Sequence, residues 1–118
     1  MSFDFNSNTP IYLQIIEHIK RQIIIGKYKP NEKIPSVREL SMEFQVNPNT
    51  VQKALIELER HGLIYTERTN GKFVTFDEKI ISKTKKESLD LIINEFYETM
   101  SSLGIDKNKV LEILRNKE

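Results

Sequence analysis

Four side chains able to hydrogen-bond to base edges or neutralise a phosphate lie close together in the run Asn-Pro-Asn-Thr-Val-Gln-Lys, residues 47–53. The carboxamides of Asn49 and Gln52 each carry a donor beside an acceptor, the pattern that pairs with adenine in a major groove. Thr50 suits a thymine methyl group or a phosphate, and the Lys53 ammonium suits a phosphate. Polar residues on a helix can also be simply solvated, so the surrounding elements must decide between the two interpretations.

Groups for catalysis or metal binding are scarce in this chain of 118 residues. It has no cysteine, and its two histidines, His18 and His61, fall on different predicted helices without any ligand or nucleophile spacing. Catalysis requires several reactive groups that converge on one point, and metal sites require clustered ligands. We therefore expect both histidines to be structural or solvent-facing, and we expect no enzyme activity, no cofactor and no metal site.

Charge and hydropathy place few limits on function. The net charge is +1; residues 1–76 hold ten Lys/Arg against eight Asp/Glu, a net +2, and the remainder is slightly acidic. No apolar run approaches membrane-spanning length, and the N-terminal segment lacks the features of a signal peptide. These observations predict a cytoplasmic protein with no membrane partner.

The run 47–53 is predicted to begin a helix. Asn47 is a favourable N-cap, Pro48 suits the first helical position, and Gly62 marks the end. Helical spacing puts four apolar residues on one inward face, namely Val51, Ala54, Leu55 and Leu58. Asn49, Thr50, Gln52 and Lys53 then remain available on the outer surface.

Another helix is predicted just before Asn47 in the chain. Ser36 and Glu39 form the capping-box pattern S-x-x-E, so this helix starts at Val37, with Leu40 and Phe44 on its core face. Arg38 and Ser36 lie at its N-terminal end and are candidate phosphate contacts. The alternative is an ion pair of Arg38 with Glu39 or Glu43, and a capping role for Ser36.

A further helix and a hairpin flank this pair. Thr9 as N-cap and Pro10 at the first helical position begin a helix that ends at Gly26, and Lys33-Ile34 can form a short strand. Residues 63–68 and 72–76 are β-prone around Asn70-Gly71, a typical two-residue hairpin turn. The hairpin tip, Thr69, Asn70, Gly71 and Lys72, is a slightly basic wing suited to a minor groove, although turn chemistry alone explains Asn70 and Gly71.

Helical periodicity returns after Asp77. A helix from about Thr84 to Leu103 is predicted to end at Gly104, and Asp106 caps a short last helix. The long helix carries an apolar stripe that either packs on the same chain or is buried against a second copy. Because the last helix is short, we favour self-association through Leu89, Ile92, Ile93, Phe96, Met100 and Leu103.

The predicted fold is mainly α with a small β-hairpin: a winged helix-turn-helix DNA-binding domain over residues 1–76, followed by two C-terminal helices forming a dimerisation tail over 77–118. The segment PSVRELSMEFQVNPNTVQKALIELERHGLI with the later GKFV resembles the DNA-binding domain of the GntR family of bacterial transcription regulators. The resemblance covers about residues 9–76, and VNPNTVQKAL with the short tail is most similar to the YtrA subfamily.

This resemblance implies DNA contacts from Arg38, Asn49, Thr50, Gln52, Lys53 and the wing at Gly71, and dimerisation through the two C-terminal helices. Other branches often carry arginine at the positions of Pro48 and Gln52, which implies a different base code here. The wing also departs from Arg-Gly-x-Gly, because Thr69-Asn70 separate Arg68 from Gly71. The residues predicted to bind DNA are Ser36, Arg38, Asn47, Asn49, Thr50, Gln52, Lys53, Thr69, Asn70, Gly71 and Lys72.

The leading hypothesis is a homodimeric repressor that occupies a pseudo-palindromic operator in double-stranded DNA upstream of its own operon. The resemblance adds that such regulators often sit beside transporter genes. No residue pattern identifies a small-molecule effector; if one exists, its expected place is between the winged helix and the tail. The alternative is a winged helix that serves as a protein-interaction module without an operator.

Overall fold

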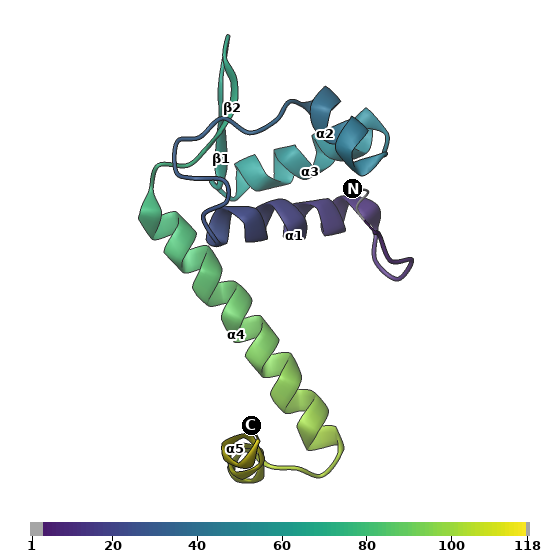
Figure 1. Ribbon diagram of the computed structural model, residues 1–118, viewed down its shortest axis with the longest axis vertical. Helices are drawn as coiled ribbons and strands as arrows, with labels where there is room; N and C mark the ends of the chain where they lie inside the picture. Colours follow the sequence, from purple (N-terminus) through teal and green to yellow (C-terminus); the bar gives the residue numbers. More distant parts are fainter. Residues whose placement is uncertain (1–3, 118) are drawn as a thin grey trace. The chain divides into compact units, whose positions relative to one another are not determined.

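The computed structural model describes residues 4–117 and is drawn in Figure 1. It divides into two compact units, the first ending at Ser82 and the second beginning at Lys83. The described residues form five helices and one antiparallel hairpin, which confirms the mainly α fold. In chain order the elements are α1 (Ile11–Ile24), α2 (Val37–Phe44), α3 (Pro48–Arg60), β1 (Ile64–Glu67), β2 (Gly71–Val74), α4 (Glu78–Ser102) and α5 (Lys107–Asn116).

The core of the first unit lies between α1 and α3. Four isoleucines of α1 are buried, and so are the four apolar residues that helical spacing placed on the inward face of α3. Leu40 and Phe44 of α2 and the hairpin residues Ile64 and Val74 join the same cluster. In Figure 1 the hairpin extends past α2 and α3 on the side away from α1. The outward faces of α2, α3 and the wing are thus left free of the core.

The start of α1 differs from the prediction by one residue. Pro10 has φ −51° and ψ 140°, so it is itself the N-cap, and Thr9 does not cap the helix. The Gln14 side chain folds back instead, and its Nε2 donates to the Thr9 carbonyl at 2.7 Å. The extended ψ of Pro10 excludes it from the helix even though its φ is compatible with one.

Both predicted caps of the helix-turn-helix are confirmed. Ser36 and Glu39 form a reciprocal capping box at the start of α2, and the Asn47 side chain caps α3 with Pro48 in the first turn. Between the two helices Gln45 adopts the left-handed conformation, with φ 56°. That residue turns the chain from α2 into α3 within three residues.

The hairpin turn is longer than predicted. Glu67 pairs with Gly71, so the loop consists of three residues, Arg68, Thr69 and Asn70, and the predicted two-residue turn at Asn70-Gly71 is wrong. The Asn70 N–H donates to the Glu67 carbonyl at 3.2 Å, and Gly71 has φ 106°. A three-residue loop followed by a positive-φ glycine is a common alternative for hairpins. The strands are also shorter than predicted, and Phe76 lies beyond β2.

A short extended segment adds to the hairpin, as Lys33-Ile34 predicted. Lys33 forms an antiparallel bridge with Phe73, and the Ile34 N–H donates to the Lys72 carbonyl at 2.9 Å. This pairing fixes the base of the wing to the chain that enters α2.

The long helix α4 begins at Glu78, earlier than the predicted start near Thr84. The Asp77 carboxylate accepts a hydrogen bond from the Lys79 N–H at 2.9 Å and acts as the cap that the periodicity did not indicate. Ile80 and Ile81 pack against the core of the first unit. In the second unit, Gly104 separates α4 from α5, the Asp106 side chain caps α5, and Val110 is fully buried.

Candidate nucleic-acid interface

The outer surface of α3 presents the two predicted base-reading carboxamides to solvent. Asn49 and Gln52 are exposed, Thr50 is half-buried, and Val51 and Ala54 beside them are buried. Within the part of the chain that the structure describes, neither the Asn49 nor the Gln52 side chain hydrogen-bonds to another group. Their donor and acceptor pairs are therefore available to an external partner.

Ser36 and Asn47 have structural roles that occupy part of their hydrogen-bonding capacity. The Ser36 Oγ accepts from the Glu39 N–H at 3.1 Å, and the Asn47 Oδ1 accepts from the Asn49 N–H at 2.7 Å. The hydrogen bond from the Ser36 backbone N–H is the largest influence that holds the pKa of Glu39 below its usual value. The Ser36 hydroxyl proton and the Asn47 amide protons remain available to donate, so capping and phosphate binding are compatible.

Arg38 is an exposed cation on α2. Glu39 and Glu43, the partners considered from the sequence, form no ion pair with it, and no other described carboxylate does so. Its guanidinium keeps all five donors for a planar partner such as a phosphate or a guanine edge.

Lys53 is tied to the first helix. Its Nζ lies 3.9 Å from the centroid of the Tyr12 ring, a cation–π contact between α3 and α1. The contact orients the ammonium without neutralising it. Lys53 therefore remains a phosphate candidate, but at the edge of α3 that lies next to α1.

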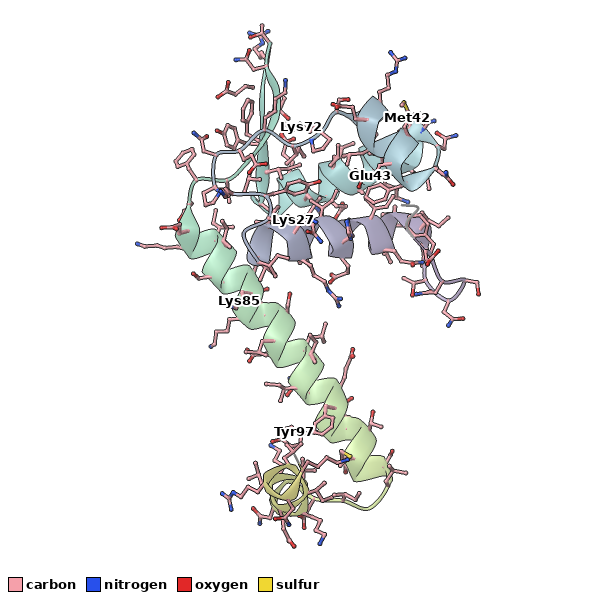
Figure 2. The ribbon with its side chains drawn as sticks, viewed as in Figure 1. Lys27, Met42, Glu43, Lys72, Lys85 and Tyr97 are labelled. Carbon is pink, nitrogen blue, oxygen red and sulfur yellow. The ribbon has the colours of Figure 1, made fainter. Side chains whose placement is uncertain are left out.

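The wing residue Lys72 belongs to a small hydrogen-bonded network with the last turn of α3. Its Nζ lies 3.1 Å from Glu59 Oε1 and 2.8 Å from Thr66 Oγ1, and the Thr66 hydroxyl donates to Glu59 Oε1 at 2.7 Å. The Thr66 hydrogen bond is the largest influence that lowers the pKa of Glu59, and Lys72 adds to it. Figure 2 labels Lys72 on the hairpin. Its positive charge is thus balanced within the protein.

The other predicted wing residues form the loop itself. Thr69 and Asn70 are in the exposed turn, and the Asn70 Nδ2 donates to Glu67 Oε2 at 3.0 Å. Gly71 follows the turn, and a Cβ there would lie 3.1 Å from the Lys33 Cε.

Two cations at the wing were not included among the predicted contacts. Arg68 is exposed in the three-residue loop and has no ion pair with any described carboxylate. Lys33 lies beside Gly71 through the bridge to Phe73. The correct loop length would have moved Arg68 from the strand into the tip, and the predicted strand at Lys33-Ile34 was the available signal for the second cation.

Residues 4–117 contain no group of three or more side chains able to hold a metal ion. Over the same range, no helix combines the length and the apolar character needed to cross a membrane.

The chain is similar in sequence to known proteins. Residues 11–74 match the family model described as "Bacterial regulatory proteins, gntR family". The HTH-type transcriptional repressor YtrA of Bacillus subtilis is 37% identical over 121 residues, which cover 98% of this chain and 89% of that protein.

Solved structures extend the similarity to the fold. A GntR family transcriptional regulator from Listeria monocytogenes matches with a TM-score of 0.90 and 38% identity, over 97% of this chain and 100% of that one. The AraR DNA-binding domain, solved in complex with operator ORX1, matches with a TM-score of 0.58 and 33% identity, over 64% of this chain and 95% of that one.

The family model spans more than half of the chain, and the repressor from Bacillus subtilis matches it almost from end to end. The homologues of this chain are transcription regulators and not enzymes. With a helix-turn-helix whose outer carboxamides are unpaired, this chain belongs to the GntR family of bacterial regulatory proteins and is a DNA-binding transcription regulator.

Proposed function

We propose that the protein is a homodimeric repressor that binds a pseudo-palindromic operator upstream of its own operon. The observation that carries the DNA-reading part is the exposed, unpaired pair of carboxamides on α3, Asn49 and Gln52. The relative YtrA is named a repressor, and the similar AraR domain was solved with an operator. Both support repression by operator occupancy.

Each predicted contact has a distinct role in this proposal. The N-terminal part of α3 enters the major groove, where Asn49 and Gln52 read adenine and Thr50 contacts a thymine methyl group or a phosphate. Phosphates are bound by Arg38 and Lys53, with further donors from Ser36 and Asn47. The wing, Thr69 to Lys72, follows the adjacent minor groove.

The second compact unit supplies the reason to propose a dimer. Its apolar side chains are left open to solvent: Phe96 is 41% exposed, Ile92 57% and Leu103 70%. Val110 is the one fully buried hydrophobic residue among those described in this unit. A stripe of this size is normally covered by a partner surface, and a second copy of the same stripe provides one.

The two parts of the chain therefore have different roles. Residues 1–76 bind DNA, and residues 77–118 form the dimerisation tail through Leu89, Ile92, Ile93, Phe96, Met100 and Leu103. Two recognition helices related by a twofold axis then contact half-sites about one helical turn apart or a multiple of it.

Genomic selection of bound fragments, followed by titration at several salt concentrations, tests this function. The wild-type protein should prefer one fragment over random DNA, and its affinity should fall steeply with salt. Asn49→Ala or Gln52→Ala should reduce that preference by about tenfold or more, while binding to random DNA changes little. Arg38→Gln should instead weaken binding to both DNAs and reduce the salt slope by roughly 1.8, because the dimer loses one phosphate contact in each subunit.

A chain that prefers no genomic fragment over random DNA would contradict the proposal. It would favour the alternative, a winged helix that binds a protein. The selected fragments also report whether the operator lies upstream of the protein's own gene, which tests the autoregulatory part separately.

A further inference from the structure

The side chain of Glu59, on α3, contacts both strands of the wing. It lies in the last turn of α3, and its Oε1 accepts from Thr66 on β1 and from Lys72 on β2, at 2.7 and 3.1 Å. The side chain of Lys72 is 21% exposed and that of Glu59 41%. The network is therefore at the protein surface, within reach of solvent and of a bound polyanion.

Lys72 differs from the other cations assigned to DNA. Arg38 has no ion pair among the described residues, and Lys53 rests on an uncharged ring. Lys72 instead places two of its three N–H donors on Glu59 and Thr66. Its charge is offset by a carboxylate in the protein before any DNA is present.

We propose that Glu59 restrains the wing: Lys72 binds a phosphate only by exchanging the Glu59 carboxylate for it, so Glu59 limits the affinity of the wing for DNA. This inference rests on the proposed function. Exposed ion pairs are weak, so a phosphate can displace the carboxylate.

Glu59→Gln tests the restraint with little change in shape. The carboxamide introduced by this substitution retains an oxygen that accepts from Thr66, but it no longer carries the charge that holds Lys72. The plot of log affinity against log salt for the selected operator fragment should become steeper by roughly 1.8, because each subunit of the dimer gains one phosphate contact. Affinity at low salt should rise severalfold.

The chain offers a closely matched control in Glu17→Gln. Glu17 pairs with Lys20 on α1 at 3.1 Å, with side-chain exposures of 54% and 20%, so distance, lysine exposure and charge change nearly equal those at Glu59. Because α1 is the scaffold helix, the salt slope of Glu17→Gln should equal that of the wild type.

A double-variant cycle assigns the effect to the lysine. In a Lys72→Gln background, Glu59→Gln should leave the slope unchanged. The inference is overturned if Glu59→Gln has the slope of Glu17→Gln, if its gain persists without Lys72, or if it weakens binding, which would make Glu59 a brace for the wing. Each of these outcomes leaves wild-type operator binding intact, whereas a wild type that prefers no fragment overturns the proposed function.

Discussion

At the scale of single residues, His18 shows how packing sets the behaviour of a titratable group. It lies on α1 with its ring perpendicular to that of Phe44, at 5.5 Å between centroids. Burial lowers the pKa of His18 below its ordinary 6.5; Glu43 acts in the opposite direction, and Lys27 and Arg21 add to the lowering. The sequence suggested a structural or solvent-facing histidine, and the half-buried ring has the structural role.

The lowered pKa predicts a decline of stability in mild acid. The unfolded chain binds the His18 proton more tightly than the folded chain, so the stability that His18 contributes is present above pH 6.5 and is lost as pH falls through the folded pKa. Urea unfolding from pH 8 to pH 5 should show this decline in the wild type. The decline should be smaller in His18→Gln, and equal pH dependence in both proteins would contradict the prediction.

The residue types on α3 could be chosen from the sequence, but their partners could not. Asn49 and Gln52 are exposed because helical spacing turns them away from Val51 and Ala54, which is local information. The contact of Lys53 with Tyr12 and that of Lys72 with Glu59 join residues from different elements. Such contacts depend on how the elements pack, and periodicity along one element does not report it.

At the scale of elements, the helix starts that a side-chain cap marks, at Ser36, Asn47 and Asp106, were predicted because capping is local, whereas the starts of α1 and α4 were misplaced. The Asn47 cap joins a role in folding to a place on the proposed DNA surface, and two substitutions separate these roles. Asn47→Ala removes the acceptor for the Asn49 N–H and should cost about 1 kcal/mol of unfolding free energy. Asn47→Asp keeps the cap and should retain wild-type stability.

Asn47→Ala and Asn47→Asp should also differ in their affinity for the operator. Asn47→Asp places a negative charge at the helix end that approaches the phosphates, so it should bind the operator more weakly than Asn47→Ala once both are folded. Urea titration gives the first quantity and fluorescence anisotropy with labelled operator the second. Stronger binding by Asn47→Asp would show that this end of α3 does not face DNA.

In the hairpin, core packing determined the turn, and the local preference of Asn70-Gly71 for a two-residue turn did not. Ile64 and Val74 are paired and both buried, at 1% and 0% exposure, so they must lie on the same face. A two-residue turn at Asn70-Gly71 shifts the register by an odd number and puts them on opposite faces. The three-residue loop keeps both in the core and stacks Tyr65 on Phe73 at 5.7 Å. The burial of Ile64 and Val74 therefore determines the length of the loop.

Gly71 is where that loop most constrains the sequence. Gly71→Ala combines a φ of 106° with a Cβ placed 3.1 Å from the Lys33 Cε. The strained backbone should cost about 1 to 3 kcal/mol in unfolding free energy. Shortening the neighbour by Lys33→Ala should relieve the contact but leave the backbone strain, so the cost of Gly71→Ala should fall only in part. Full recovery in the double variant would mean that the backbone tolerates alanine there.

At the scale of the whole molecule, the structure describes two units that differ in how large a hydrophobic core each one has. The first has a core with residues from three helices and the hairpin, whereas the second consists of the rest of α4 and α5 around Val110. Such a two-helix unit buries too little apolar surface to be stable by itself. We therefore expect the tail to be stable as a dimer. Because the dimer brings two copies of α3 to the operator, a change that disrupts the dimer should also weaken operator binding.

Phe96→Asp tests that coupling. A carboxylate in the middle of the stripe cannot be buried against a second copy without a large desolvation cost, so sedimentation should show monomers. Affinity for the full operator should fall by about a hundredfold or more, because two linked contacts become one, while affinity for a single half-site stays near the wild-type value. Phe76→Asp makes the same change in the first unit at a side chain that is 71% exposed, and it should leave the dimer intact. A dimer that persists in Phe96→Asp would place the interface elsewhere, and monomers formed equally by both variants would show that the loss reflects added charge and not the stripe.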